Sequence, residues 1–286
     1  MWAWHPIGAL ICAILGGFGD ASLQRMPMLA RRLIIASGLL MLLAGCLFSP
    51  SKAYAPLPEE TKAELQQKGL SLGAPLFIRI FKLEAEMEVW MQRPSGEYAL
   101  FRTYPICNWS GDVGPKVREG DKQAPEGFYI VTARQMNPNS QYYLSFNIGY
   151  PNAYDVAHDY TGSFLMVHGG CLSAGCYAIT DEAIQELYIL AREAFAQGQK
   201  EFPIHAFPFR MTDEAMSFRK GHKWEAFWQN LREGYKLFEE TKKPPIVGVK
   251  NKRYVFFADG AAVPDAFKTA SAKDPLAPRL ISGLQN

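Results

Sequence analysis

Short β-rich runs separated by turn residues fill the middle of the chain and constrain its fold more than any other feature. Between residues 76 and 167, runs of four to eight residues rich in β-branched and aromatic side chains alternate with clusters of Gly, Pro and Asn. This spacing is typical of antiparallel strands joined by turns. The runs are 76–81, 86–91, 97–104, 127–133, 142–148 and 164–167. They predict a mostly antiparallel β domain.

Helical periodicity follows these strands. Thr180 is a suitable N-cap because Asp181 and a second acidic residue occupy the first turn after it, and Gly198 marks the end of the helix. A second helix is expected from Thr212, and a third over 224–231, where aromatic residues recur at i, i+3, i+4 and i+7. The remaining predicted elements are a strand over 203–209 and a hairpin formed by 246–249 and 254–257. The predicted fold class is therefore α+β, mainly β with flanking helices.

The N-terminus has the pattern of an export signal. Two arginines precede an apolar run of 11 residues over 33–43, which is too short to span a bilayer comfortably. The run ends in Leu43-Ala44-Gly45-Cys46, which resembles the bacterial lipobox, so the predicted mature chain begins at an acylated Cys46. The residue after this cysteine is not Asp, which favours the periplasmic face of the outer membrane. An uncleaved helix over 33–48 is the alternative.

The charge distribution agrees with export. The net charge is +2, and residues 1–46 alone carry +2, so the remainder of the chain sums to zero and offers no broad nucleic-acid surface. Residues 1–25 contain a second apolar stretch, which favours a true start at Met26 or Met28 over an additional membrane helix.

These features divide the chain into four parts. Residues 1–45 form the leader, and 46–73, rich in proline and charge with one short helix over 59–68, are predicted to be a tether. The main folded domain, with its C-terminal helices and hairpin, is expected over 74–257, and 258–286 are predicted to be a flexible tail.

Cysteine usage indicates a free thiol. Of the five cysteines, Cys12 lies in the leader and Cys46 in the lipobox, which leaves Cys107, Cys171 and Cys176. An odd number in an oxidising compartment leaves one thiol unpaired, and a catalytic nucleophile is one reason to keep it. A Cys171–Cys176 disulfide would block Cys176, whereas a Cys107–Cys171 disulfide would leave it free.

The segment over 164–181, FLMVHGGCLSAGCYAITD, carries the candidate chemistry. An apolar strand ends at His168, two glycines permit a tight turn, and Cys176 follows directly behind Gly175. A thiol is a good nucleophile as thiolate, and a neighbouring imidazole and backbone N–H groups both lower its pKa. The sequence therefore predicts a Cys176–His168 pair with a depressed thiol pKa.

This segment resembles the YkuD family of L,D-transpeptidases, whose signature is His-Gly, a variable loop and Ser-His-Gly-Cys. The corresponding residues are His168-Gly169 and Ser173-Ala174-Gly175-Cys176, and 124–129 is similar to the family's Thr-Pro-x-Gly-x-Phe strand entry. Ala174 in place of the second His, and Tyr177-Ala178 in place of Ile-Arg, match the YafK-like branch. The likeness covers most of 74–257; further segments that carry it are 107–111, 114–116, 147–155, 208–213 and 243–245.

The resemblance implies a YkuD-like β-sandwich and a thioester mechanism without metal or organic cofactor. Cys176 would be the nucleophile that attacks the meso-diaminopimelate carbonyl of a peptidoglycan stem peptide, and His168 the proton acceptor and donor. N–H groups near Gly175 would stabilise the oxyanion, and Ser173 and Gly169 would support the loop. The branch implies hydrolysis of the link between diaminopimelate and the lysine of a peptidoglycan-attached lipoprotein. Crosslinking or lipoprotein attachment is the alternative.

Rival interpretations remain open at this stage. His168, Cys171 and Cys176 with His158 could ligate zinc, although their spacing is not that of a common zinc module. A non-catalytic peptidoglycan-binding module is the other alternative. Candidates for secondary roles in substrate binding are Lys116 and Arg210, which could hold a carboxylate, and Tyr142, Tyr143 and Tyr154, which could line a cleft.

Overall fold

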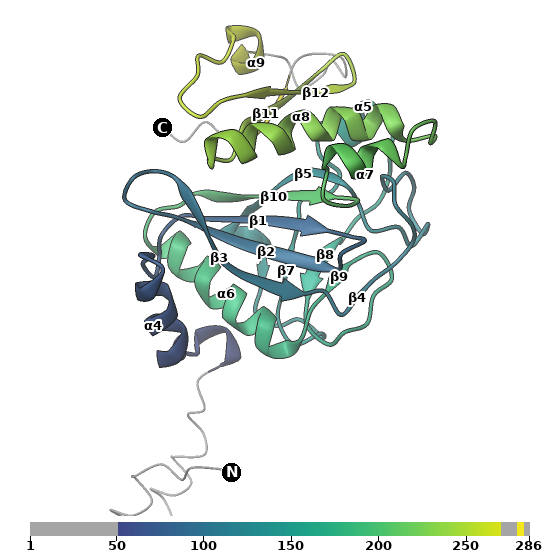
Figure 1. The fold of residues 1–286 in the computed structure, drawn as a ribbon. Coiled ribbons are helices and arrows are strands. Elements are labelled where there is room, and N and C mark those ends of the chain that lie inside the picture. Colours follow the sequence, from purple (N-terminus) through teal and green to yellow (C-terminus); the bar gives the residue numbers. More distant parts are fainter. Residues whose placement is uncertain (1–50, 270–278, 283–286) are drawn as a thin grey trace, which may run out of the picture. The chain divides into compact units, whose positions relative to one another are not determined.

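The computed structural model describes residues 51–269 and 279–282, which form an α+β fold built on three β-sheets (Figure 1). The first sheet has five strands in the order β3-β2-β1-β10-β5, and β1 pairs with β10 in parallel while the other pairs are antiparallel. Every residue of β1 is buried, as expected for an apolar run covered on both faces. The bounds are β1 (Leu76–Phe81), β2 (Glu86–Gln92), β3 (Tyr98–Pro105), β5 (Gly127–Thr132) and β10 (Glu201–Phe207).

The second sheet carries the predicted chemical segment. Its order is β4-β9-β8-β7-β6, and β8 pairs with β9 in parallel. The prediction of a mainly β domain is confirmed, with two parallel pairs that the sequence did not indicate. The predicted strand over 142–148 is reduced to β7. The bounds are β4 (Asn108–Trp109), β6 (Met136–Asn137), β7 (Ser145–Asn147), β8 (Met166–His168) and β9 (Tyr177–Ala178).

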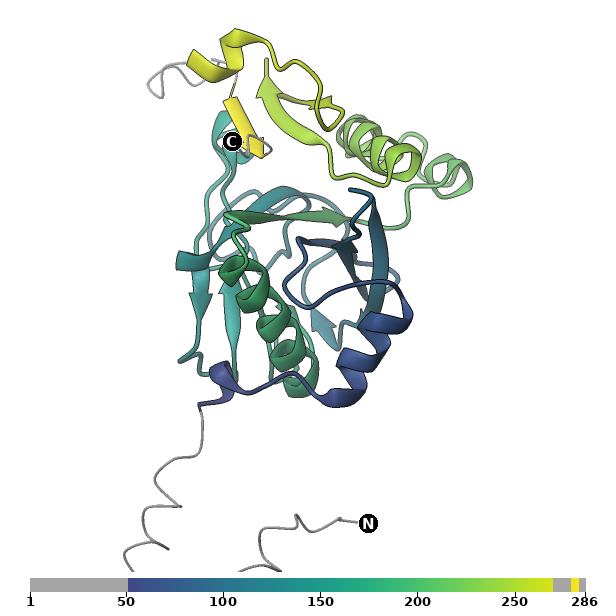
Figure 2. The same ribbon diagram turned by 90° about the vertical axis from the view of Figure 1, so that its left-hand side faces the viewer.

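Helix α6 (Asp181–Ala196) joins the two larger sheets. The Thr180 hydroxyl accepts a hydrogen bond from the Ala183 N–H at 3.2 Å, which confirms the predicted N-cap. The helix contacts both β1 and β8, and Figure 2 shows it between the blue strands of the first sheet and the teal strands of the second. Its buried side chains Ile184, Leu187 and Leu190 belong to the main hydrophobic core.

A second core lies between the first sheet and the C-terminal elements. Helix α8 (Glu225–Thr241) buries Trp228 and Leu231, members of the predicted aromatic stripe, against Phe81 and Phe207 of the first sheet. The third sheet, in the order β12-β11-β13, contains the predicted hairpin. The remaining bounds are η1 (Lys52–Tyr54), α4 (Glu59–Gln67), η2 (Ala133–Gln135), α5 (Ala153–Ala157), α7 (Asp213–Ser217), β11 (Ile246–Lys250), β12 (Arg253–Phe257), α9 (Asp265–Thr269) and β13 (Arg279–Ser282).

A buried ion pair anchors the loop that precedes β5. Lys82 and Glu126 are fully buried, and the Lys82 ammonium donates to Glu126 Oε1 at 3.0 Å and to the Ala124 carbonyl at 2.9 Å. The same loop reaches the second sheet, because the Tyr177 hydroxyl donates to the Pro125 carbonyl at 2.5 Å. The charges are paired and hydrogen-bonded, as burial requires, and they hold this loop beside residues 175–177.

Residues 52–73 do not form the predicted tether. The short helix expected there exists as α4 (Glu59–Gln67), but Leu57, Leu65 and Leu70 are buried in the main core. The prediction of a tether over 46–73 is therefore wrong for 52–73. Its proline and charge content suggested solvation, but three leucines spaced along the segment supply an apolar face that the domain covers.

The tail over 258–286 is also structured in its described part. Val263 and Phe267 pack with Ile246 in a small cluster, and β13 (Arg279–Ser282) pairs with β11. These contacts contradict the prediction of a flexible tail for 263–267 and 279–282.

The predicted leader over 1–45 and Cys46 lie outside the described residues. Within 51–269 and 279–282, no helix has the length and apolar character needed to cross a bilayer.

Candidate functional site

The strand pairing of β8 and β9 brings Cys176 and His168 to the same face of the second sheet. Val167 on β8 lies opposite Tyr177 on β9, so the same register places Cys176 beside Met166. The Met166 N–H donates to Cys176 Sγ at 3.4 Å. Residues opposite each other in a sheet share a face, and so do residues two apart along a strand. The thiol and the imidazole therefore lie on one face, two positions apart in register.

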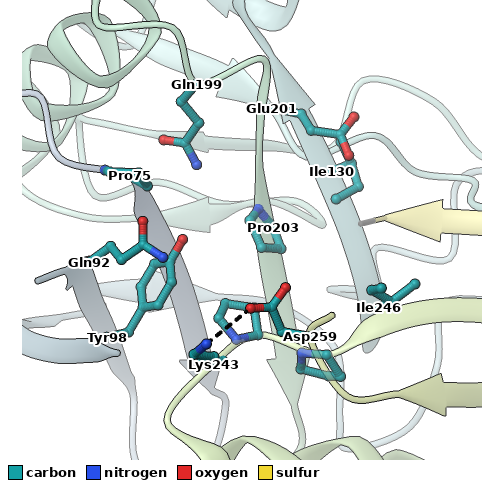
Figure 3. Close-up of a pocket in the computed structure, with 12 residues that line it drawn as sticks. Pro75, Gln92, Tyr98, Ile130, Gln199, Glu201, Pro203, Lys243, Ile246 and Asp259 are labelled. Atoms are coloured by element: carbon teal, nitrogen blue, oxygen red, sulfur yellow. Dashed lines mark ion pairs between the residues drawn. The ribbon is translucent and has the colours of Figure 1, made fainter. Parts of the chain in front are cut away.

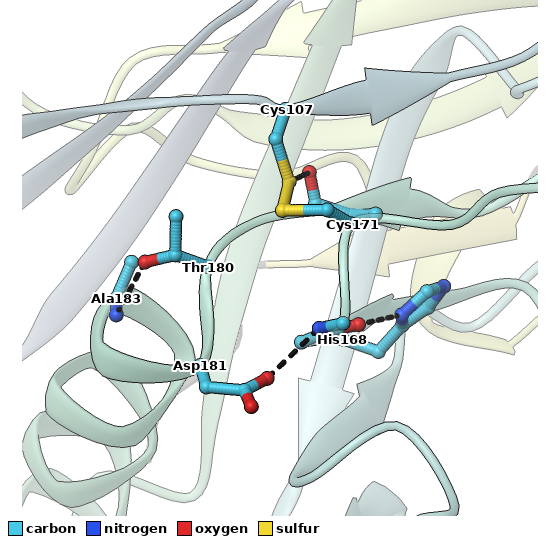
Figure 4. The surroundings of a disulfide bond; sticks show 9 residues. Cys107, His168, Cys171, Thr180, Asp181 and Ala183 are labelled. Atoms are coloured by element: carbon cyan, nitrogen blue, oxygen red, sulfur yellow. Dashed lines mark hydrogen bonds between the residues drawn. A yellow bond between two sulfur atoms is a disulfide. The ribbon is translucent and has the colours of Figure 1, made fainter.

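His168 is held as a neutral base. Its ring is 3% exposed, and Nδ1 lies 2.6 Å from the Gly169 carbonyl oxygen (Figure 4). A carbonyl only accepts hydrogen bonds, so Nδ1 carries the proton and Nε2 keeps its lone pair. Burial lowers the pKa of His168, although the bond to Gly169 opposes this shift. The ring of Tyr142 lies against the imidazole, with centroids 4.7 Å apart.

The thiol of Cys176 is not pre-ionised. Burial raises its pKa above the ordinary value, and the Met166 N–H and the positive charge of Lys116 lower it by less. The prediction of a depressed thiol pKa is therefore wrong for this arrangement. Burial therefore favours the neutral form of both the thiol and the imidazole.

A disulfide joins Cys107 to Cys171, with a Cα–Cα distance of 5.4 Å, and leaves Cys176 as a free thiol (Figure 4). Of the two pairings that the sequence left open, this is the one that spares the candidate nucleophile. A disulfide-bonded Cys171 also cannot serve as one of the four zinc ligands considered in the sequence analysis. Across 51–269 and 279–282, no group of three or more His, Cys, Asp or Glu side chains is arranged to hold a metal ion.

The loop between His168 and Cys176 packs tightly against the start of α6. A Cβ atom on Gly169 would lie 2.4 Å from Asp181 Oδ1, so only glycine fits there. Gly175, directly before Cys176, has φ +121°, a conformation that favours glycine. The Ser173 hydroxyl donates to the Cys176 carbonyl at 2.6 Å and so holds the end of the loop.

Asp181 is the residue of this site that the sequence analysis missed. Its Oδ1 accepts a hydrogen bond from the Gly170 N–H at 2.9 Å. The sequence assigned it only to the first turn of a helix. Its position in the sequence could have indicated a role in the site, because Asp181 lies five residues after Cys176 at the start of the helix that follows the motif.

Several candidates for secondary roles are already engaged. Lys116 is buried and pairs with Asp121 at 2.5 Å, and Arg210 forms ion pairs with two glutamates of β2. Neither arrangement leaves a cation free for a substrate carboxylate. Tyr142 lies at the site beside His168, whereas Tyr154 belongs to the second core.

A cavity of about 160 Å³ lies away from this site (Figure 3). Prolines 75, 203, 244 and 245 line it together with Tyr98, and an ion pair between Lys243 and Asp259 of 3.3 Å lies at its edge. None of its lining residues belongs to the segment from Phe164 to Asp181. The cavity lining contains no cysteine or histidine, so the chemistry of Cys176 and His168, and not the cavity, defines the candidate active site.

Comparisons with solved structures give distant similarities. The helical cell shape determining protein Pgp2 from Campylobacter jejuni aligns over 62% of this chain and 67% of its own, with TM-score 0.39 and 18% identity. Bd1075 from Bdellovibrio bacteriovorus aligns over 59% of this chain and 61% of its own, with TM-score 0.33 and 20% identity. No protein-family model matches the chain.

Comparison with curated protein sequences finds a relative with much higher sequence identity to this chain. The chain is 43% identical over 226 residues to the putative L,D-transpeptidase YafK of Escherichia coli strain K12, and the values for Escherichia coli O157:H7 are the same. The alignment covers 77% of this chain and 89% of the relative. This identity extends far beyond the active-site motif. The chain therefore belongs to the L,D-transpeptidase family, in its YafK-like branch.

Proposed function

We propose that this protein is a cysteine-dependent peptidoglycan enzyme that attacks the carbonyl of meso-diaminopimelate in a stem peptide and forms a thioester on Cys176. The observation that carries the proposal is that the β8–β9 register brings Cys176, a free thiol, near His168, whose imidazole is oriented by the Gly169 carbonyl. The disulfide between Cys107 and Cys171 also supports the proposal, because Cys171 lies in the loop between His168 and Cys176 and the disulfide fixes that loop.

The proposed reaction begins with proton transfer. His168 Nε2 accepts the thiol proton while Cys176 Sγ bonds to the carbonyl carbon, and the carbonyl oxygen becomes an oxyanion. N–H groups at Gly175 and Cys176 are the nearest candidates for donors to that oxyanion. When the C–N bond breaks, the imidazolium returns its proton to the leaving amine, and the acyl group remains on sulfur as a thioester.

The second half of the reaction decides between hydrolysis and crosslinking. Water activated by His168 Nε2 would release a carboxylic acid, whereas an amine acceptor would form a new amide; either step regenerates the thiol. We propose hydrolysis of the bond between diaminopimelate and the lysine of an attached lipoprotein. The YafK-like motif and the loop of seven residues between His168 and Cys176, with Leu172 exposed, favour water access. Transpeptidation is the second candidate.

Two substrates distinguish these outcomes. The purified protein is incubated with sacculi that carry covalently attached lipoprotein, and separately with disaccharide tetrapeptide. Release of lipoprotein without new crosslinked dimers is expected. Dimers joined through two diaminopimelate residues, without lipoprotein release, would instead assign crosslinking.

Variants of the two residues test the mechanism. Cys176→Ala is expected to abolish turnover and acyl-enzyme formation, which intact-protein mass spectrometry detects, and His168→Ala to slow turnover about 10²-fold or more. Normal turnover by Cys176→Ala would overturn the assignment. Substrate binding without turnover by the wild type would point to a non-catalytic peptidoglycan-binding module.

We further propose that the mature chain is a lipoprotein acylated at Cys46 and exposed on the periplasmic face of the outer membrane. The Leu43–Cys46 motif after the apolar run supports this proposal. Mass spectrometry of the membrane-extracted protein should find an acylated N-terminal Cys46. An intact leader would refute it.

A further inference from the structure

One peptide group connects Asp181 to His168. The carbonyl of Gly169 accepts the Nδ1–H of His168 at 2.6 Å, and the N–H of Gly170 donates to Asp181 Oδ1 at 2.9 Å (Figure 4). The Gly169 carbonyl and the Gly170 N–H belong to the same planar amide. The two hydrogen bonds therefore form a continuous chain from a carboxylate through one amide to the imidazole.

Such a chain has an electrostatic consequence. A carboxylate that accepts a hydrogen bond from an amide N–H polarises the amide group. The partial positive charge on the N–H increases, and so does the partial negative charge on the carbonyl oxygen. The carbonyl then stabilises a proton on His168 more strongly. Gly169 and His168 are buried, so water screens the bond between them only partly, whereas the bond between Gly170 and Asp181 is exposed and is screened more strongly. The bond to the Gly169 carbonyl raises the pKa of His168 against the effect of burial, and a stronger bond would raise it further.

The geometry of the loop is built around this contact. A side chain on Gly169 would collide with Asp181 Oδ1, and Gly170 has φ +79°, a conformation that favours glycine. Asp181 itself is fixed at the start of α6 by the capped first turn. The carboxylate is thus held against the amide by the helix and not by a flexible side chain alone.

We propose that Asp181 is a positioning residue that acts through the Gly169–Gly170 amide to orient His168 and raise its basicity. This inference rests on the proposed role of His168 as the base. Asp181 makes no direct contact with the imidazole, so it is not a catalytic residue. Other titratable groups facing His168 are Tyr142, whose ring packs on it, and Cys176 on the same face, with the charge of Lys116 acting on that thiol.

The test distinguishes the negative charge of Asp181 from the hydrogen bond that its side chain accepts. Asp181→Asn keeps an acceptor for the Gly170 N–H but removes the negative charge, and Glu182→Gln makes the same charge change at the next, exposed position of the same turn. The imidazole of His168 is titrated by NMR in the full chain, with its signal assigned by its loss in His168→Ala. The midpoint is expected to fall by roughly 0.5–1 pH unit in Asp181→Asn and by no more than about 0.2 in Glu182→Gln.

A second measurement distinguishes failure of the inference from failure of the proposed function. The pH dependence of Cys176 alkylation by iodoacetamide should shift in Asp181→Asn and change most in His168→Ala. Asp181→Glu, which keeps the charge, should retain the wild-type midpoint. If Asp181→Asn unfolds, Asp181→Ser, which also removes the charge and keeps an oxygen acceptor, is titrated in its place and should show the same fall in midpoint. Equal midpoints in Asp181→Asn and Glu182→Gln would overturn the inference alone. An unchanged alkylation profile in His168→Ala would refute His168 as the base.

Discussion

Burial governs the charge states of the two residues that carry the proposed chemistry. It lowers the pKa of the His168 imidazole and raises the pKa of the Cys176 thiol, so the neutral forms of both are favoured. A thiolate–imidazolium pair would be costly to maintain in this environment. In the proposed reaction, proton transfer would therefore accompany the attack of the thiol, with the tautomer of His168 already set by the Gly169 carbonyl.

A buried carboxyl on α5 makes stability depend on pH. Burial raises the pKa of Asp155 from 3.8 to about 7, although its hydrogen bonds to the backbone of Asn152 and to Tyr129 oppose the shift. Because the folded-state pKa is raised, the stability this group contributes is complete below pH 3.8 and is lost as pH rises through 7. The loss approaches about 4 kcal/mol at most.

We expect Asp155→Asn to be more stable than the wild type at pH 8, with a smaller gain at pH 5. The amide oxygen can still accept from the Asn152 N–H, which the carboxylate binds at 2.9 Å, so the turn is preserved. Thermal unfolding at the two pH values measures the difference. Asp159→Asn, at an exposed position just after α5, is the control and should show little change. A gain of equal size at both pH values would contradict this account.

At the scale of elements, the segment before β1 belongs to the domain. Leu65 on α4 is 1% exposed within the main core, whereas Leu72 in the same segment is 37% exposed. Leu65→Ala should lower the free energy of unfolding by about 2–5 kcal/mol, because it leaves a cavity between α4 and the domain. Leu72→Ala should cost well under about 1 kcal/mol. Chemical denaturation measures both, and equally small losses would mean that this segment does not contribute to the folded core.

The elements that the sequence predicted well are those with a local physical signature. The apolar run over 76–81 matches β1, and Thr180 caps α6 as expected, because strand composition and capping act over a few neighbouring residues. Two-residue strands such as β4 and β9 have no such signature. β4 pairs with β9, and β9 also pairs with β8, so pairing with strands from other parts of the chain decides them.

At the scale of the whole molecule, the Cys107–Cys171 disulfide closes a loop of 64 residues and ties β4 to the loop after β8. Replacing both cysteines by serine should lower stability by about 4 kcal/mol in the chain-entropy model. Cys176 should remain reactive, because its contacts with Met166 and the Ser173 loop bond do not involve the disulfide. Thermal unfolding and thiol titration measure the two properties.

The control for this prediction is Cys176→Ala, which removes the free thiol and should leave stability nearly unchanged. If the double serine variant unfolds at the wild-type temperature, the disulfide does not stabilise the fold. If its Cys176 no longer reacts with iodoacetamide, the loop depends on the disulfide for the geometry of the thiol.

The sequence by itself determined the strands and helices that have a local signature, and it singled out His168 and Cys176 as the candidate residues for chemistry. The strand runs, the capped helix and the His168–Cys176 motif are local patterns, and they can be read without knowledge of the fold. Only the tertiary structure decided which cysteines pair, that 52–73 pack on the domain, and that both the thiol and the imidazole favour their neutral forms. Disulfide pairing, core membership and pKa depend on distances and burial between residues far apart in the chain, and no local pattern encodes them.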